Sequence, residues 1–348
     1  MFASIPLGRS TTRSLAHFVT VSSSNGLPST ARNHATRSLS YHSQSKSLSS
    51  SLSNSRAKSF FSTTSPRSEV TTETEPLDSP AEPHVSSIKA ELPDGRGVLG
   101  GITIRNGAKL NIMNSKMLVQ LKDALHEMAK EPHLRAVILT SEKVEGKTPA
   151  FCGGADIHEM ASLNNPQDAE AFIRKIHRVC NEIRAIPAPV VARIHGICLG
   201  AGLEIVAACD FRFATTKSVF SMPEVKVGIP SVVEARLLVN LVGWQRTRRL
   251  CMLAEELTAA KAQRWGLVDY VLRENNIDGQ IEQFVNQISS HGPKAMKAQK
   301  ELFMKWEEEP QKHGIKAGID AFASMWEDGG SEPKQYMRKF INRKKTTS

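Results

Sequence analysis

The stretch that most constrains the fold runs from residue 190 to residue 210 and reads VVARIHGICLGAGLEIVAACD. A strand-like apolar run is followed by a glycine-rich turn and then by a helix whose residues around Glu204 are almost all apolar. A helix that is apolar nearly all round is buried, and carboxylates are rarely buried unless they are paired or functional. The segment therefore predicts a strand, a turn and a buried helix that carries a carboxylate facing a cavity.

A second glutamate and a second glycine-rich turn belong to the same prediction. Glu224 lies in FSMPEVKVGIP (220–230), and FCGGAD (151–156) follows another strand-like run. Taken singly, FCGGAD is a tight turn that needs glycine, and Glu224 is equally well a surface acid. Taken together, two carboxylates can divide the roles of acid and base, and exposed turn amides can bind an oxyanion. These are the ingredients for protonating a substrate that forms an oxyanion.

The wider pattern alternates strands and helices, which is typical of an α/β fold with sites at the turns that follow strands. Apolar runs predict strands at residues 98–104, 136–140 and 190–194. Helical periodicity predicts helices at 114–131 and 168–185, and a further helix through Glu204. The last third reads as helical, with segments at 232–242, 245–253, 258–265, 281–289, 294–309 and 314–327.

The positive charge of the chain is concentrated in residues 1–68, which contain eight Lys and Arg residues and no Asp or Glu. Removing these eight from the formal net charge of +10 leaves +2 for residues 69–348. The basic composition is therefore not a nucleic-acid footprint. A leader that is rich in Arg and Ser and poor in acids is typical of a mitochondrial transit peptide; the alternative is a disordered basic tail. Residues 69–85 are acidic and contain proline, as in a linker, and we expect residues 86–348 to form the folded domain that carries the candidate site.

The sequence does not indicate a metal site, a disulfide framework or a transmembrane helix. The five cysteines show no C-x-x-C spacing and have apolar neighbours, so we expect reduced core cysteines. His158 and His195 lack the spacing of a metal pair. His195 is interpreted as a hydrogen-bonded core histidine, and His158 as either a residue on the rim of the pocket or a surface residue. Charged residues interrupt the longest apolar stretch, so no transmembrane helix is expected.

Four motifs in this order resemble the enoyl-CoA hydratase/isomerase (crotonase) family: FCGGADIHEM, PVVARIHGICLGAGLEIVAACDFRFAT, FSMPEVKVGIP and LTAAKAQRWGLVDYV. The resemblance covers roughly residues 90–345. It implies an α/β fold built as a spiral of β-β-α units, with a helical C-terminal region that assembles homotrimers or hexamers. It also implies an acyl-CoA thioester substrate and no metal or redox cofactor, since coenzyme A is part of the substrate.

The resemblance also assigns roles to residues. The main-chain amides of Ala155 and Ala201, in the turns of Gly154 and Gly200, match the oxyanion hole for the thioester carbonyl. Many relatives have glycine where Ala201 stands, but the donor is a backbone group. Glu204 and Glu224 match the two glutamates that flank the water added across the double bond.

One departure from the family pattern follows Gly228, where many hydratases have a proline and a glycine-rich turn and this chain reads IPSVVEAR (229–236). Ser231 and Glu234 thereby become candidate pocket residues, together with His158.

The expected activity is hydration of a trans-2-enoyl-CoA in fatty-acid or branched-chain acyl-CoA breakdown in the mitochondrial matrix. The alternatives are a Δ3,Δ2-enoyl-CoA isomerase or another crotonase-type acyl-CoA lyase, and, from another class, an RNA-binding homologue. The isomerase needs a single base, so the presence of two glutamates argues against it.

Overall fold

The computed structural model describes residues 84–310 and, beyond them, residues 313, 319–320, 322, 324, 327, 331–333 and 335. The predicted leader at 1–68, nearly all of the predicted linker and most of the predicted helix at 314–327 lie outside the described residues. The strand that begins at Val85 opens the described part of the chain.

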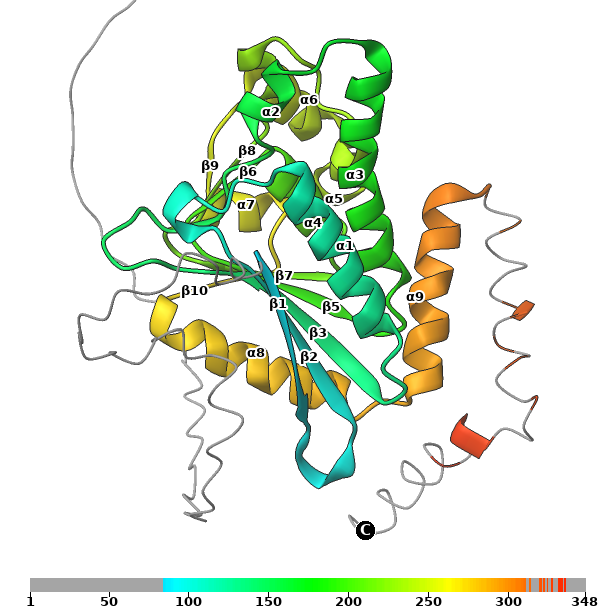
Figure 1. The fold of residues 1–348 in the computed structure, drawn as a ribbon. Helices are drawn as coiled ribbons and strands as arrows, with labels where there is room; N and C mark the ends of the chain where they lie inside the picture. The colour runs from blue at the N-terminus through cyan, green and yellow to red at the C-terminus, as the bar shows by residue number, and fades with distance from the viewer. Residues whose placement is uncertain are drawn as a thin grey trace, which may run out of the picture. The chain divides into compact units, whose positions relative to one another are not determined.

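Two sheets form the framework of the described residues (Figure 1). Each sheet has one antiparallel pair of strands at one end, and all its other pairs are parallel. The larger sheet has the order β1 (Val85–Glu91), β2 (Val98–Ile104), β3 (Leu134–Ser141), β5 (Val190–Ile194), β7 (Phe211–Thr215) and β10 (Tyr270–Leu272). The smaller has the order β4 (Ala150–Cys152), β6 (Ile197–Leu199), β8 (Val219–Ser221) and β9 (Leu257–Thr258).

The chain repeats a unit of one strand from each sheet followed by a helical segment. Strand β3 leads to β4, β5 to β6 and β7 to β8. The helical segments that follow are α2 (Ile157–Ala161) with α3 (Pro166–Ala185), then α4 (Ala201–Ala207), then the 3-10 turn η4 (Glu224–Val227). This is the spiral of β-β-α units that the resemblance implied. Because β4, β6 and β8 are neighbouring parallel strands, the turns at their carboxyl ends meet at one edge of the smaller sheet.

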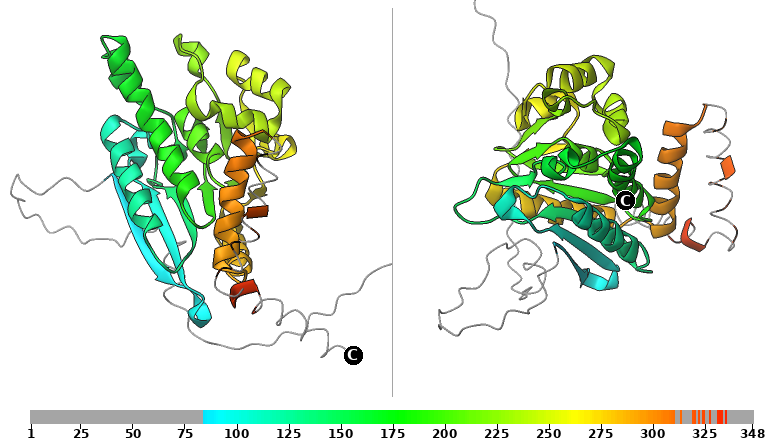
Figure 2. Two further views of the ribbon diagram at one scale, coloured as in Figure 1. Left: turned by 90° about the vertical axis from the view of Figure 1, so that its right-hand side faces the viewer. Right: turned by 45° about the horizontal axis from the view of Figure 1, so that its top comes forward.

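Helices cover the larger sheet on both faces (Figures 1 and 2). Side chains alternate along a strand, so Val137 and Leu139 of β3 join the core under α1 (Ser115–Ala129) and α3, whereas Ala136 and Ile138 join the core under α8 (Glu274–Ile288). Both faces of the sheet are therefore buried at its central strands, which is why β2, β3 and β5 read as largely apolar runs.

The remaining elements complete the described part of the chain: η2 (Pro93–Gly95), η3 (Gly107–Lys109), η5 (Val233–Arg236), α5 (Leu237–Val242), α6 (Trp244–Leu253), α7 (Ala259–Trp265) and α9 (Pro293–Glu308). The predicted helix at 232–242 is present as the 3-10 segment η5 followed directly by α5, and it begins at Val233 with a φ of 40°, which a β-branched residue rarely adopts. The predicted helix at 281–289 begins earlier, at Glu274, where a polar first turn hides its start from the apolar pattern. Helix α9 lies beside the C-terminal end of α3, where Lys300 Nζ donates to Ile183 O.

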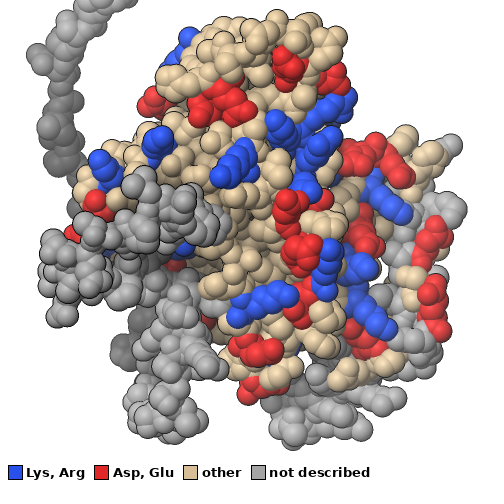
Figure 3. Space-filling model, in the orientation of Figure 1, with Lys and Arg blue, Asp and Glu red and all other residues tan. Residues whose placement is uncertain are grey.

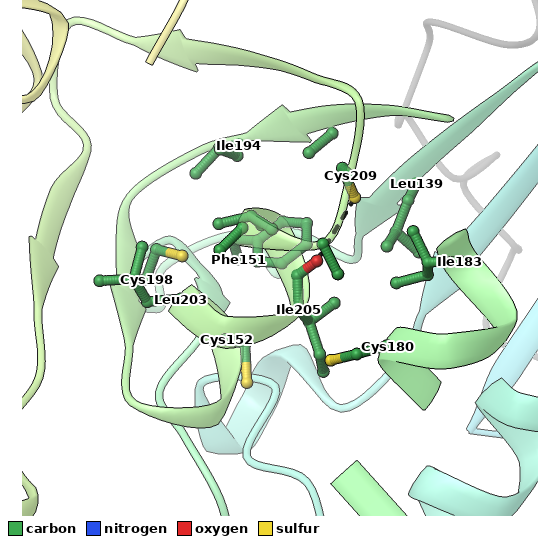
Figure 4. Packing of buried hydrophobic residues seen from close by; sticks show 14 of the residues in the cluster. Leu139, Phe151, Cys152, Cys180, Ile183, Ile194, Cys198, Leu203, Ile205 and Cys209 are labelled. Carbon is green, nitrogen blue, oxygen red and sulfur yellow. Dashed lines mark hydrogen bonds between the residues drawn. The ribbon is translucent and has the colours of Figure 1, made fainter. Parts of the chain in front are cut away.

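Four of the cysteine side chains are packed in the larger core, as Figure 4 shows, and all five are free thiols: Cys152, Cys180, Cys198, Cys209 and the half-buried Cys251. The prediction of core cysteines is confirmed for the four buried residues. On the face shown in Figure 3, acidic and basic side chains are mixed over the surface. No helix among the described residues is long and apolar enough to span a membrane.

Candidate active site

The turn after β4 presents one backbone amide to a cavity. Gly154 has a φ of 113°, which strongly favours glycine, and Met113 holds the turn from both sides: its amide donates to Gly154 O and its carbonyl accepts from the amide of Asp156. Ala155 lies between these two bonds and lines the cavity, and within the described residues its own N–H has no protein acceptor. That amide is a free donor.

The turn after β6 presents the second amide. Gly200 has a φ of 49° and donates to Ser221 O, which fixes the start of α4 against β8. Ala201 is the first residue of that helix and also lines the cavity. As a first-turn residue it has no helical acceptor for its N–H, and the described residues provide none. Gly202 lies against Cys152, and a Cβ at this glycine would come within 2.6 Å of Cys152 Cβ, so the close packing of α4 on β4 requires glycine.

The two predicted glutamates lie on the same cavity. Every residue of α4 is buried, and Glu204 is only 4% exposed. Its Oε1 accepts from the backbone N–H of Ala235 at 3.2 Å. Glu224 begins η4 after β8, is half-buried, and places its Oε1 over Gly200, where a Cβ would come within 2.5 Å of that oxygen. The other oxygen of Glu224 accepts from Ser231 Oγ at 2.9 Å.

The two carboxyl groups lie in different environments, and burial is the main difference between them. Burial, followed by the charge of Glu224, raises the pKa of Glu204 to about 8, so near neutral pH Glu204 is protonated in the free protein. Glu224 is more exposed, and it accepts a hydrogen bond from the Ser231 hydroxyl. The pair can therefore both accept and donate a proton.

The cavity itself has a volume of about 730 Å³ and a mostly apolar wall. Helices α2 and α3 form one side, and the segment after η4 forms the other. The apolar side chains are Ile112, Ile157, Met160, Leu163, Phe172, Ile173, Ile176, Val227, Ile229, Pro230 and Val232. Its acidic side chains are Glu204, Glu224 and Glu170. A cavity of this size and character suits an elongated apolar ligand.

The predicted additional pocket residues take three different positions. Ser231 contacts Glu224 directly. His158 is exposed and does not line the cavity, because the side chains of α2 that do are Ile157 and Met160, three residues apart on the helix. Glu234 is buried but faces a separate cleft, because the left-handed backbone of Val233 turns η5 toward α3. His158 thus takes the surface position that was one of its two expected positions, whereas Glu234, a candidate pocket residue, lines a cleft other than this cavity.

Sequence reasoning did not assign the apolar wall of the cavity. Phe172 and Ile176 were identified only as core positions of a helix, and their 3.6-residue periodicity does not distinguish a core from a pocket lining. The exposed apolar residues Val227, Ile229 and Val232 offered the clearest signal, since side chains of this kind in a loop commonly border a ligand site.

Two other expectations concern histidine and metals. His195 is fully buried, as predicted, but the expected hydrogen bond is not found, since neither ring nitrogen has a partner in the described part of the chain. Among the described residues, no group of three or more His, Cys, Asp or Glu side chains is arranged to hold a metal ion. The site thus consists of two free amides and two carboxyl groups around an apolar cavity, which can polarise a carbonyl group and move protons beside it.

Comparisons with known proteins agree with this geometry. A family model described as enoyl-CoA hydratase/isomerase matches residues 95–347. Bacillus subtilis (strain 168) YngF, whose name assigns it provisionally as an enoyl-CoA hydratase/isomerase, is 32% identical over 200 residues, which are 57% of this chain and 75% of the relative. The crystal structure of an enoyl-CoA hydratase from Mycobacterium smegmatis matches with a TM-score of 0.67 and 27% identity, over 74% of this chain and 97% of that one.

A second solved structure, an enoyl-CoA hydratase from Bacillus anthracis, matches with a TM-score of 0.62 and 26% identity, over 69% of this chain and 90% of that one. The two structures share the fold over nearly their whole lengths. The family model spans well over half of this chain and includes both turns and both glutamates. The chain therefore belongs to the enoyl-CoA hydratase/isomerase (crotonase) family.

Proposed function

We propose that the chain is an enoyl-CoA hydratase, which adds water across the 2,3 double bond of a trans-2-enoyl-CoA. The observation that carries the proposal is that Glu204 and Glu224 border the same cavity as the free amides of Ala155 and Ala201. The names of the solved relatives from Mycobacterium smegmatis and Bacillus anthracis support the same activity.

The two amides act on the thioester oxygen. When water attacks C3, negative charge develops on the carbonyl oxygen of the thioester as an enolate forms. The N–H groups of Ala155 and Ala201 are held by their turns before substrate arrives, so they stabilise that charge without reorganising. Loss of one such donor reduces kcat by about 10²- to 10³-fold in comparable sites.

The two carboxyl groups act on the water and on C2. The ionised member of the pair accepts a proton from water as the oxygen bonds to C3, and the protonated member delivers a proton to C2. In the free protein the proton resides on Glu204, whose pKa is raised to about 8, mainly by burial. General acid and base assistance of this kind contributes about 10²- to 10⁴-fold each.

The wall of the cavity supports a hydrocarbon acyl chain as the substrate class. Apart from the two glutamates of the pair, Glu170 is the charged residue among the described residues that line the cavity, and it belongs to α3, where it pairs with Arg174. A carboxylated or hydroxylated acyl tail would lose its hydration against this wall without gaining hydrogen bonds. This favours the acyl-CoA esters of fatty-acid or branched-chain breakdown.

The experiment that tests the activity follows the ultraviolet absorbance of the conjugated enoyl thioester. Purified protein should remove it from crotonyl-CoA or from a longer or branched 2-enoyl-CoA, and Glu204→Gln and Glu224→Gln should each lower kcat by at least about 10²-fold. Full hydration by Glu204→Gln would contradict the two-acid mechanism. No hydration of any substrate, with conversion of a 3-enoyl-CoA to the 2-enoyl-CoA, would instead identify an isomerase.

The proposed site of action is the mitochondrial matrix. Its support is the leader at residues 1–68, in which eight basic residues and many serines occur without an acidic residue. A fluorescent reporter fused to these residues should enter mitochondria, whereas the same fusion with its arginines and lysines changed to glutamine should not. A cytosolic reporter would leave the leader as a basic tail.

A further inference from the structure

A third acid lies buried behind the proposed catalytic pair. Glu234, on η5, is 7% exposed, and its Oε1 lies 2.7 Å from Nδ1 of His177 on α3. Asn181 Nδ2 donates to His177 Nε2 at 3.0 Å. That bond leaves the imidazole proton on Nδ1, facing the carboxylate. The other oxygen, Oε2, is buried and has no hydrogen-bond partner among the described residues.

Glu234 is also adjacent to Glu204. The backbone N–H of the next residue, Ala235, donates to Glu204 Oε1, so η5 orients the carboxyl group of Glu204 directly. The buried thiol of Cys180 lies near both acids: burial raises its pKa well above the usual value, and the charges of Glu234 and Glu204 add to the rise. The two carboxyl groups thus share one poorly hydrated region, reached from opposite sides.

The cations nearest to Glu234 are engaged elsewhere. Glu234 and His177 line a cleft of about 730 Å³ that is separate from the acyl cavity. In that cleft Arg174 pairs with Glu170, Arg184 with Glu307 and Glu308, and Arg236 donates to Asn240. Among the described residues, His177 is therefore the partner of Glu234 Oε1, and its half-exposed ring connects the buried acid to solvent in the cleft.

We propose that Glu234, held by His177, is a positioning residue for the hydration proposed above: η5 places a negative charge behind Glu204, which favours the proton on that side chain, and orients its carboxyl group through the N–H of Ala235. That N–H alone favours the ionised form, and the charge of Glu234 counteracts it. The inference rests on the proposed function of Glu204. It assigns a role to the segment in which this chain departs from the glycine-rich family pattern. Glu234 acts through Glu204 and does not touch the substrate.

The charge of Glu234 gives this role a signature in the pH profile. Burial and the charge of Glu224 dominate the raised pKa of Glu204, and the charge of Glu234 adds to them. Removing the charge should lower the pKa at which Glu204 loses its proton. The alkaline limb of kcat/KM for hydration, expected near pH 8 in the unmodified protein, should then move to lower pH.

The test compares four single variants of the full chain. Glu234→Gln should shift the alkaline limb down by roughly half a pH unit or more, so that activity above that limb falls by roughly threefold or more. Near pH 6, Glu204 is protonated in both the variant and the unmodified protein. The kcat of Glu234→Gln at that pH should therefore stay within about twofold of the unmodified value. His177→Leu should shift the limb in the same direction, because Glu234 then loses the side chain that holds its carboxyl group behind Glu204. Glu234→Asp, which keeps the charge, should shift it less.

The fourth variant, Glu307→Gln, removes a negative charge that α9 contributes to the same cleft. It should leave the alkaline limb of the pH profile at its original pH. If Glu234→Gln folds and its limb does not move, or if activity falls equally at all pH values, the proposal is overturned. The second result would mark a merely structural role.

An infrared titration makes the test independent of turnover. The carbonyl band of a protonated carboxylic acid that disappears in Glu204→Gln belongs to Glu204, and in Glu234→Gln this band should vanish at lower pH than in the unmodified protein. A shifted band without hydration of any enoyl-CoA would uphold this inference while rejecting the proposed function. Hydration of an enoyl-CoA together with an unshifted band would support the proposed function and reject this inference.

Discussion

At the scale of single residues, Gly200 couples the backbone of the second turn to the position of Glu224. Its φ is 49°, and an added Cβ would come within 2.5 Å of Glu224 Oε1. We expect Gly200→Ala to lower the unfolding free energy by about 1–3 kcal/mol, and to lower kcat for hydration by on the order of tenfold or more, because displacement of a reacting group by less than 1 Å is costly. Urea unfolding and steady-state kinetics measure the two effects.

A matched glycine separates this local effect from the general effect of the substitution. Gly279 lies exposed within α8, and an added Cβ there would meet nothing within 4 Å. Gly279→Ala should therefore stabilise the protein by about 0.5–1 kcal/mol and leave kcat unchanged. Equal losses of activity in the two variants would show that the contact between Gly200 and Glu224 has no special role.

His195 predicts a pH dependence of stability at the same scale. Burial, followed by the charge of Arg193, lowers the pKa of His195 from its ordinary value of 6.5 to about 4. Between these values the unfolded chain binds a proton and the folded chain does not. The stability linked to His195 is thus fully present above pH 6.5 and is lost as the pH falls toward 4, by about 3 kcal/mol in total.

Urea unfolding of His195→Leu between pH 4 and pH 7 checks this expectation. The variant removes the titrating ring, so its unfolding free energy should gain about 3 kcal/mol relative to the unmodified protein as the pH is lowered through this window. Glu204 titrates in both proteins and cancels in the difference. Parallel pH profiles would contradict the assignment.

At the scale of elements, one buried lysine attaches α9 to the rest of the fold. Lys300 is 7% exposed, and its Nζ donates to Ile183 O, to Ala188 O and to Asp210 Oδ2 at 2.6 Å. Lys300→Met should lower the unfolding free energy by about 3–5 kcal/mol, because it removes the cation beside the Asp210 carboxylate and the donor to two buried carbonyl groups. Lys297→Met, which breaks only an exposed pair with Glu301, should change it by less than about 1 kcal/mol. Similar values for the two variants would show that α9 is held mainly by its apolar contacts.

The sequence predicted the long elements well and the short ones poorly, for a physical reason. Strands at 98–104 and 190–194 and the helix at 168–185 carry enough apolar residues to reveal their period, and the structure confirms them. Strands β6 and β8 have three residues each, too few for any period to appear. They are ordered by pairing with each other and with β4, which is a tertiary effect.

The same distinction applies to the site. The buried position of Glu204 followed from its own apolar helix, because that signal is local. The contact of Glu234 with His177 joins residues 57 positions apart and depends on the left-handed turn at Val233, so no local pattern indicated it. The order of the family motifs can indicate which distant residues meet at the site, but only where the chain follows the family pattern. It gives no such indication at residues 229–236, where the chain departs from that pattern.

At the scale of the whole molecule, the exposed apolar side chains of α6 predict self-association. Trp244, Met252 and Leu253 are 61%, 71% and 68% exposed. Large apolar side chains gathered on one short helix usually mark an interface, and we expect the homotrimer or hexamer that the family resemblance implied. Sedimentation velocity of the full chain should show a trimer or larger species at micromolar concentration.

A charge introduced on α6 tests whether that helix forms the interface. Leu253→Lys places a charge where an interface would exclude water, so it should shift the sedimentation toward monomer by raising the dissociation constant on the order of 10-fold or more. Val119→Lys is the control, because Val119 of α1 is 46% exposed and lies apart from the apolar side chains of α6. Equal dissociation in both variants would place the interface elsewhere. A monomeric unmodified protein that still hydrates an enoyl-CoA would show that one chain supplies a complete site.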